Sequence, residues 1–226
     1  MCGRFTLTAK IESVTELLRT APVSPYEPRY NIAPSQPVLT LLNDGSRKLT
    51  FTHWGLIPGW SGGPGKWKPL VNARAETLSE KPSFRACLRT KRCLIPADGF
   101  YEWPRSASKG PPVYIRMANG GVFAFAGLWD EWQDREGGLI ISSTIITTRP
   151  NRLLETVHDR MPVILKPEYF EQWISQNLIP DREVEQMLQP FSANEMHMHP
   201  VSAKVNNARH DHPDCIAPAA QQSFGF

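Results

Sequence analysis

The chain has 226 residues, of which 41% are hydrophobic and 21% charged, and this length suits one domain or at most two small ones. No apolar run approaches the roughly 20 residues that a membrane-spanning helix needs, and the N-terminus lacks a secretory-signal pattern. The four cysteines, Cys2, Cys87, Cys93 and Cys215, are too widely spread for a disulfide framework. We therefore expect a reduced, cytoplasmic protein that does not bind membranes.

The net charge of +3 is unevenly distributed. Residues 47–109 contain twelve Lys and Arg against four acidic residues, an excess of +8, so the rest of the chain sums to −5. A basic middle segment is typical of proteins that bind an anion such as nucleic acid. A solvated surface has the same pattern, and charge alone does not separate the two.

The first predicted element is a helix after Thr8, a suitable N-cap, with Ile11, Val14 and Leu18 on one face. The proline-rich residues 22–37 exclude a regular helix or a central strand. A hairpin follows, with Asp-Gly at its turn. Its two strands are expected at 38–43 and 48–54. Further strands are expected at 92–103, 112–118, 121–129, 139–148 and 161–165. Short helices are expected at 79–90, 149–157, 167–175 and 181–189.

About seven strands joined mainly by hairpin-like turns predict a mostly antiparallel sheet or open barrel with packed helices, which is the α+β class. No linker separates two cores, so a single domain over residues 1–226 is expected. Residues from about 210 to 226 are expected to form a loosely held C-terminal tail.

The chain begins with the residues MCGRF. The initiator methionine is normally removed when the second residue is small, which would leave Cys2 with a thiol beside a free α-amine. No internal cysteine offers this pair, because its nitrogen is part of an amide. From these residues alone, a small buried residue at a frayed terminus is the better explanation of Cys2.

Six stretches of the chain are read together: CGRF at 2–5, RYNIAPSQ at 29–36, VNARAET at 71–77, IPADGFYEW at 95–103, VHDRMPV at 157–163 and HPVSAKVNN at 199–207. In their order and joint occurrence they resemble one family, the SOS response-associated peptidase (SRAP) domain. The resemblance spans nearly the whole chain. The resemblance implies a protein that shields abasic sites in single-stranded DNA by bonding to them through its N-terminal cysteine. The family name also records a peptidase activity.

The chemistry of Cys2 agrees with this expectation. A ring-opened abasic deoxyribose presents an aldehyde, which a primary amine converts to an imine, and a neighbouring thiol can then close a five-membered thiazolidine. An α-amine titrates at about 7.7–8.0, far below lysine at about 10.4, so more of it is reactive near neutrality. We expect Arg4 to favour the thiolate of Cys2.

Three further residues are implied as catalytic by their places in the family motifs. Glu102, between Tyr101 and Trp103, would transfer protons, although a turn carboxylate paired with an arginine is the alternative. His158 would act as a general acid or base, although a lone histidine is more often structural. Asp159 could orient a neighbouring group, but strand neighbours point to opposite faces, so no His158–Asp159 pair is claimed from the sequence. Asn72 would orient the reactants.

The DNA contacts are expected from basic, polar and aromatic side chains. Asn72 and Arg74 share a face of an extended segment, where an arginine can grip a phosphate, although an edge strand without function fits as well. Base stacking adds about 1–3 kcal/mol per base in single-strand binding. The expected phosphate contacts are Arg4, Arg74 and Thr147, and the expected base contacts are Trp103 and Pro34, with Trp60 or Trp67 as further candidates.

Three alternatives come from other functional classes. An N-terminal nucleophile hydrolase would use the Cys2 thiol with its own amine as base. Non-covalent single-strand binding would not need a terminal cysteine. Zinc binding would use a C-terminal group whose spacing matches no standard ligand pattern, so neither a metal nor an organic cofactor is expected. That group is His197, His199, His210, His212 and Cys215. We expect a monomer that associates with the nucleoid when bound to DNA.

Overall fold

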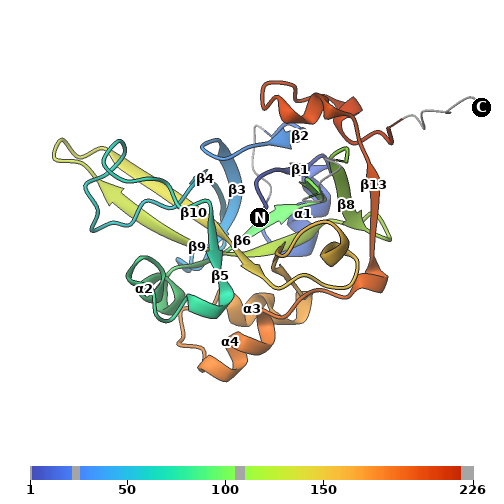
Figure 1. Cartoon of the computed structure of the whole chain (residues 1–226). Helices are drawn as coiled ribbons and strands as arrows, with labels where there is room; N and C mark the ends of the chain where they lie inside the picture. The colour runs from blue at the N-terminus through green and yellow to red at the C-terminus, as the bar shows by residue number, and fades with distance from the viewer. Residues whose placement is uncertain (1, 22–25, 105–109, 220–226) are drawn as a thin grey trace, which may run out of the picture.

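A closed barrel of five strands lies at the centre of the computed structural model, which describes residues 2–21, 26–104 and 110–219 (Figure 1). The strand order β10-β4-β3-β6-β9 closes because β9 also pairs with β10. Only the β10–β4 contact in this ring is parallel. The strands are β3 (Pro37–Leu42), β4 (Leu49–Trp54), β6 (Arg92–Ala97), β9 (Phe123–Gln133) and β10 (Leu139–Thr148).

Three short strands extend the barrel sheet. β5 (Asn72–Arg74) runs parallel to the end of β10, while β11 (Met161–Pro162) pairs with β10 and β12 (Ile164–Leu165) with β9. The strand expected at 161–165 is therefore divided between two partners. The pairing of β5 with β10 aligns Asn72 with Ile145 and Arg74 with Thr147, which fixes both expected site residues of β5 against the barrel.

A second, antiparallel sheet has the order β13-β8-β7-β1-β2. The strand expected at 92–103 is two strands in different sheets, because the chain leaves the barrel at Asp98. The Asp98 carboxylate accepts hydrogen bonds from the Thr6 hydroxyl at 2.5 Å and the backbone N–H of Ala9 at 2.8 Å, which holds the bend. The strands are β1 (Phe5–Leu7), β2 (Arg29–Ile32), β7 (Gly99–Glu102), β8 (Val113–Met117) and β13 (Met196–Pro200).

The helices pack outside the strands, and α3 and α4 lie together on the side away from β2 (Figure 1). Thr8 is not the N-cap of α1, because that position is Lys10 and the Thr8 hydroxyl donates to Asp98 instead. The helix expected at 149–157 is only a 3₁₀ turn, Leu154–Thr156. The helices are α1 (Ile11–Leu18), α2 (Pro82–Thr90), α3 (Phe170–Trp173) and α4 (Asp181–Met187).

Two hydrophobic clusters fill the described part of the chain. The large one contains the barrel interior and β1, where the Phe5 ring packs 5.0 Å from Trp54 and 5.7 Å from Phe125. The small one lies between the second sheet and residues 201–216, and includes Tyr101 and Cys215. Gly99 leaves room for this layer, since a Cβ there would meet the Tyr114 ring.

The segment expected as a tail is held against the protein as far as residue 219. Its Asp211 carboxylate accepts the backbone N–H of Tyr30 at 2.5 Å, and its Cys215 is fully buried. Residues 220–226 of that expected tail lie outside the described residues. Among the helices of the described residues, none is long and apolar enough to cross a membrane.

Candidate functional site

Cys2 is fully buried at the start of β1. Burial, followed by the nearby Glu102 carboxylate, raises the pKa of the Cys2 thiol well above its usual range. The guanidinium of Arg4 does not offset this, because only the Arg4 backbone carbonyl contacts the sulfur, at 4.0 Å. The expectation that Arg4 favours the thiolate is therefore wrong.

Asn72 connects the N-terminus to the barrel. Its side-chain Nδ2 donates to the carbonyl oxygen of Cys2 at 2.9 Å, across 70 positions of sequence. Its Oδ1 is buried and has no hydrogen-bond partner among the described residues. An acceptor oxygen held beside Cys2 can receive an N–H or O–H from a reacting group.

Glu102 ends β7 and is 2% exposed. It enters the site because β7 pairs antiparallel with β1, with Phe100 opposite Phe5. The residues that follow Phe100 therefore lie opposite those that precede Phe5. A carboxylate buried here has lost most of its water, which favours proton exchange with a neighbouring group. The structure thus brings Cys2, Asn72 and Glu102 together in one largely buried site.

His158 is 6% exposed and lies in a bend just before β11. Its Nδ1 accepts the backbone N–H of Arg160 at 3.0 Å and lies 2.9 Å from an oxygen of Asp159. The sequence offered no ground to claim this proximity of His158 and Asp159, which arises because these residues form a bend and not a strand. When Nδ1 carries a proton it can donate to Asp159, so the carboxylate can stabilise the imidazolium.

Arg160, which was not among the site residues expected from the sequence, joins this bend to β5 and β10. Its guanidinium binds both carboxylate oxygens of Glu76, at 2.7 and 2.9 Å, and donates to the Thr147 carbonyl at 2.5 Å. Because Thr147 pairs with Arg74, these contacts place the His158 bend next to the strand that carries Asn72. The signal in the sequence was an arginine inside the VHDRMPV motif.

Arg4 is partly buried on the other side of Cys2. Its Nη1 donates to the side-chain oxygen of Asn31 at 2.7 Å and to the Val205 carbonyl at 2.6 Å. Its guanidinium carbon lies 5.9 Å from the centre of the Trp103 ring, and the Trp103 indole N–H donates to Asn206 at 2.7 Å. The expected DNA contacts Arg4 and Trp103 therefore lie together, held by the C-terminal segment.

The remaining expected contacts differ in exposure. Arg74 is exposed, and Pro34 is half-buried in the turn between β2 and β3. Thr147 is fully buried, and its hydroxyl donates to the Ala73 carbonyl at 3.3 Å. The buried Thr147 side chain therefore does not face a ligand directly, and Thr147 contacts Arg160 through its carbonyl oxygen. Trp60 is 62% exposed and its ring lies edge-on to Trp67 at 5.1 Å.

The fold and site together define a class of α+β protein with a buried cysteine just behind its first residue, next to an amide side chain and near a carboxylate. Residues 1–208 match the profile of the family described as SOS response associated peptidase (SRAP). The chain belongs to this family, which confirms the resemblance read from the motifs.

Relatives and solved structures of similar length support this assignment. The chain is 46% identical over 222 residues to "Abasic site processing protein YoqW" of Bacillus subtilis, covering 96% of this chain and 99% of that one. It is 33% identical to "Abasic site processing protein YedK" of Escherichia coli, covering 96% and 100%. A crystal structure of a Bacteroides thetaiotaomicron protein superposes with a TM-score of 0.87 at 27% identity, covering 96% of this chain and all of that one.

Proposed function

We propose that this protein binds single-stranded DNA and forms a covalent thiazolidine with abasic sites through the α-amine and thiol of Cys2. The adduct would protect the lesion from strand cleavage during the response to DNA damage. The observation that carries the proposal is the enclosure of Cys2 by Asn72 and Glu102. The names of the relatives, which are abasic site processing proteins, agree with it.

The reaction balances with these groups alone. After Met1 is removed, the Cys2 amine attacks the sugar aldehyde, and the carbinolamine loses water to give an imine. The sulfur then adds to the imine carbon, and the thiol proton passes to the nitrogen. Glu102 would carry protons between these atoms, Asn72 would hold the amine through its Oδ1, and His158 would protonate the sugar oxygen as the ring opens.

The raised pKa of the Cys2 thiol supports an order in which the amine reacts first. A thiolate-first mechanism, as in an N-terminal hydrolase, needs a thiol that ionises readily, and burial beside Glu102 opposes this. In the amine-first order the thiol can stay protonated until the imine has formed. Ring closure then removes the imine that would otherwise lead to β-elimination.

The DNA strand would follow the basic and aromatic groups on either side of Cys2. Arg74 is exposed beside Asn72, and Arg4 lies against Trp103, so phosphates and bases would meet both sides of the lesion. Pro34 would pack against a base. Thr147 would act through Arg160, which it helps to hold. We further propose one domain acting as a monomer, associated with the nucleoid when bound.

The decisive experiment mixes trimmed protein with a single-stranded oligonucleotide containing one abasic site and separates the products on a denaturing gel. We expect a slowly migrating species that Cys2→Ala and Cys2→Ser both abolish, because each variant keeps the α-amine but has no thiol, so its imine is labile and is lost on the gel. Cys87→Ala serves as the matched thiol control. Equal yield from Cys2→Ala would refute the proposal.

The hydrolase alternative is tested in parallel, with the same variants purified with Met1 still attached. If the wild type forms no adduct but releases its own Met1 in a reaction that Cys2→Ala blocks, the hydrolase is supported and the crosslinking proposal fails. If an adduct forms, mass spectrometry of its N-terminal peptide should show a sugar fragment on Cys2. Methionine still attached to Cys2 in that adduct would also exclude the thiazolidine.

A further inference from the structure

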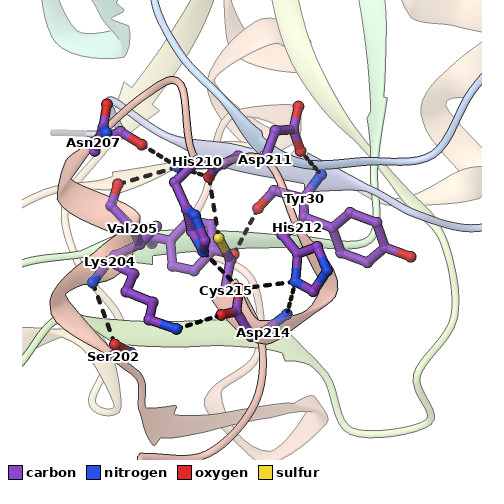
Figure 2. Close-up of polar contacts among 12 residues, drawn as sticks. Tyr30, Ser202, Lys204, Val205, Asn207, His210, Asp211, His212, Asp214 and Cys215 are labelled. Carbon is purple, nitrogen blue, oxygen red and sulfur yellow. Dashed lines mark hydrogen bonds and ion pairs between the residues drawn. The ribbon is translucent and has the colours of Figure 1, made fainter.

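The C-terminal segment brings three metal-ligand side chains together, away from the Cys2 thiol. Figure 2 shows His210, Asp214 and Cys215 converging inside the turn that ends this segment. One ligand atom from each, a ring nitrogen, a carboxylate oxygen and the sulfur, lie within 4.8 Å of one another. We propose that these three side chains bind a zinc-class divalent cation, a site that is independent of the proposed reaction with DNA.

The three donors suit this class of metal. Thiolate, imidazole and carboxylate are the ligands of zinc, and three protein ligands leave a fourth position for water. In a tetrahedral site the ligand atoms lie about 3.3–3.8 Å apart. The His210 Nε2 to Asp214 Oδ1 distance of 2.7 Å would widen as the cation replaces their hydrogen bond, and the sulfur would move inward.

The ligands are already oriented by neighbouring groups, as metal ligands usually are. Lys204 binds the other carboxylate oxygen of Asp214 at 2.8 Å, while Oδ1 lies 2.7 Å from the His210 Nε2 and 3.2 Å from the His212 Nδ1. Asn31 donates to the His210 carbonyl at 2.8 Å, and that same carbonyl accepts the Cys215 thiol at 3.2 Å. Before any cation binds, Lys204 therefore holds the Asp214 carboxylate, Asp214 holds the His210 ring, and the His210 carbonyl holds the Cys215 thiol.

Binding requires deprotonation of the thiol. Burial raises the pKa of Cys215, so the cation would displace the thiol proton to solvent, and affinity should rise with pH. When the cation binds, a metal–sulfur bond would replace the hydrogen bond from the Cys215 thiol to the His210 carbonyl. A cation here would also hold His210 more firmly, and the His210 carbonyl accepts from Asn31.

Sequence spacing alone did not predict this site. The ligand group considered from the sequence held histidines and Cys215 but not Asp214, which the 3₁₀ turn Pro213–Cys215 brings beside His210. Two of the histidines in that group are used elsewhere. His199 bonds the Ile216 carbonyl at 2.9 Å, and His197 lies exposed on β13.

The test titrates EDTA-treated, reduced protein with Co²⁺ and follows the absorption spectrum. We expect one equivalent to give tetrahedral visible bands and a near-ultraviolet sulfur-to-cobalt band, with Zn²⁺ displacing both. Cys215→Ser should remove the near-ultraviolet band, and Asp214→Asn should weaken binding by about tenfold or more. His197→Gln is the matched control and should bind normally.

A thermal shift gives an independent readout. Zn²⁺ should raise the unfolding temperature of the wild type and of His197→Gln but not of Asp214→Asn, whose side chain is 33% exposed and tolerates the change. This variant decides the question if Cys215→Ser does not fold. Absence of the cobalt bands in the wild type, or their full retention in Asp214→Asn, would overturn the proposal and leave a hydrogen-bonded cluster.

Discussion

Arg92 and Arg4 are both withdrawn from solvent, but their surroundings differ. Arg92 is fully buried at the start of β6, and its guanidinium donates five hydrogen bonds to backbone carbonyls. Arg4 is partly buried, donates two hydrogen bonds from Nη1, and its Nε has no partner among the described residues. An arginine whose five donors are satisfied serves the fold, whereas one with capacity left can also bind a ligand.

The largest effect is expected from Arg92→Met. The guanidinium ties the end of α2 to the turn after α3, through the carbonyls of Leu88, Arg89, Trp173, Ser175 and Asn177. Removing it leaves these acceptors unpaired, so the free energy of unfolding should fall by about 3–5 kcal/mol. Urea denaturation measures this.

The control for that change is Arg47→Met, whose exposed pair with Glu171 should contribute less than about 1 kcal/mol. DNA affinity per folded molecule should be unchanged in both variants. A loss of less than about 1 kcal/mol in Arg92→Met would show that the carbonyls find other partners.

A mixed effect is expected from Arg4→Met. Two hydrogen bonds and the contact with Trp103 disappear, which should lower the free energy of unfolding by about 1–2 kcal/mol. Loss of one phosphate contact should also weaken single-stranded DNA binding by about tenfold. Fluorescence anisotropy at low salt measures this affinity, and unchanged binding would make Arg4 purely structural, like Arg92.

A binding effect without a stability effect is expected from Arg74→Ala, since this side chain is exposed. Losing one phosphate contact should reduce the slope of log K against log salt by about 0.7 for a single strand. Arg85→Ala, an exposed change on α2, should leave the slope unaltered. Equal slopes in Arg74→Ala and wild type would remove Arg74 from the phosphate site.

The smallest expected effect is a pH dependence of stability that arises from the pair of Arg160 with Glu76. Its hydrogen bonds lower the pKa of Glu76 below the ordinary value of 4.5, so the pair stabilises the fold above that pH. This stability is lost as pH falls through the lower, folded-state pKa. Thermal unfolding of Glu76→Gln should therefore lie slightly below wild type at pH 7 and converge with it in acid. A constant difference would show that Glu76 does not titrate with this pair.

The sequence by itself determined the family, the α+β class, the hairpin of β3 and β4, and the chemistry available to Cys2. These follow from local patterns, because periodicity, turn residues and ordered motifs are written in contiguous residues. It also placed Glu102, Asn72 and His158 in motifs, without showing that the first two enclose Cys2.

Only the tertiary structure decided how distant residues divide their contacts. It ended β6 at Ala97, buried Thr147 and brought the Asn72 side chain to Cys2 across 70 positions. The bond from Arg4 to Val205 spans 201 positions, and no local pattern can encode a partner at that distance. Such contacts depend on which surfaces the packed barrel and sheet bring together, and that follows from the burial of the whole core.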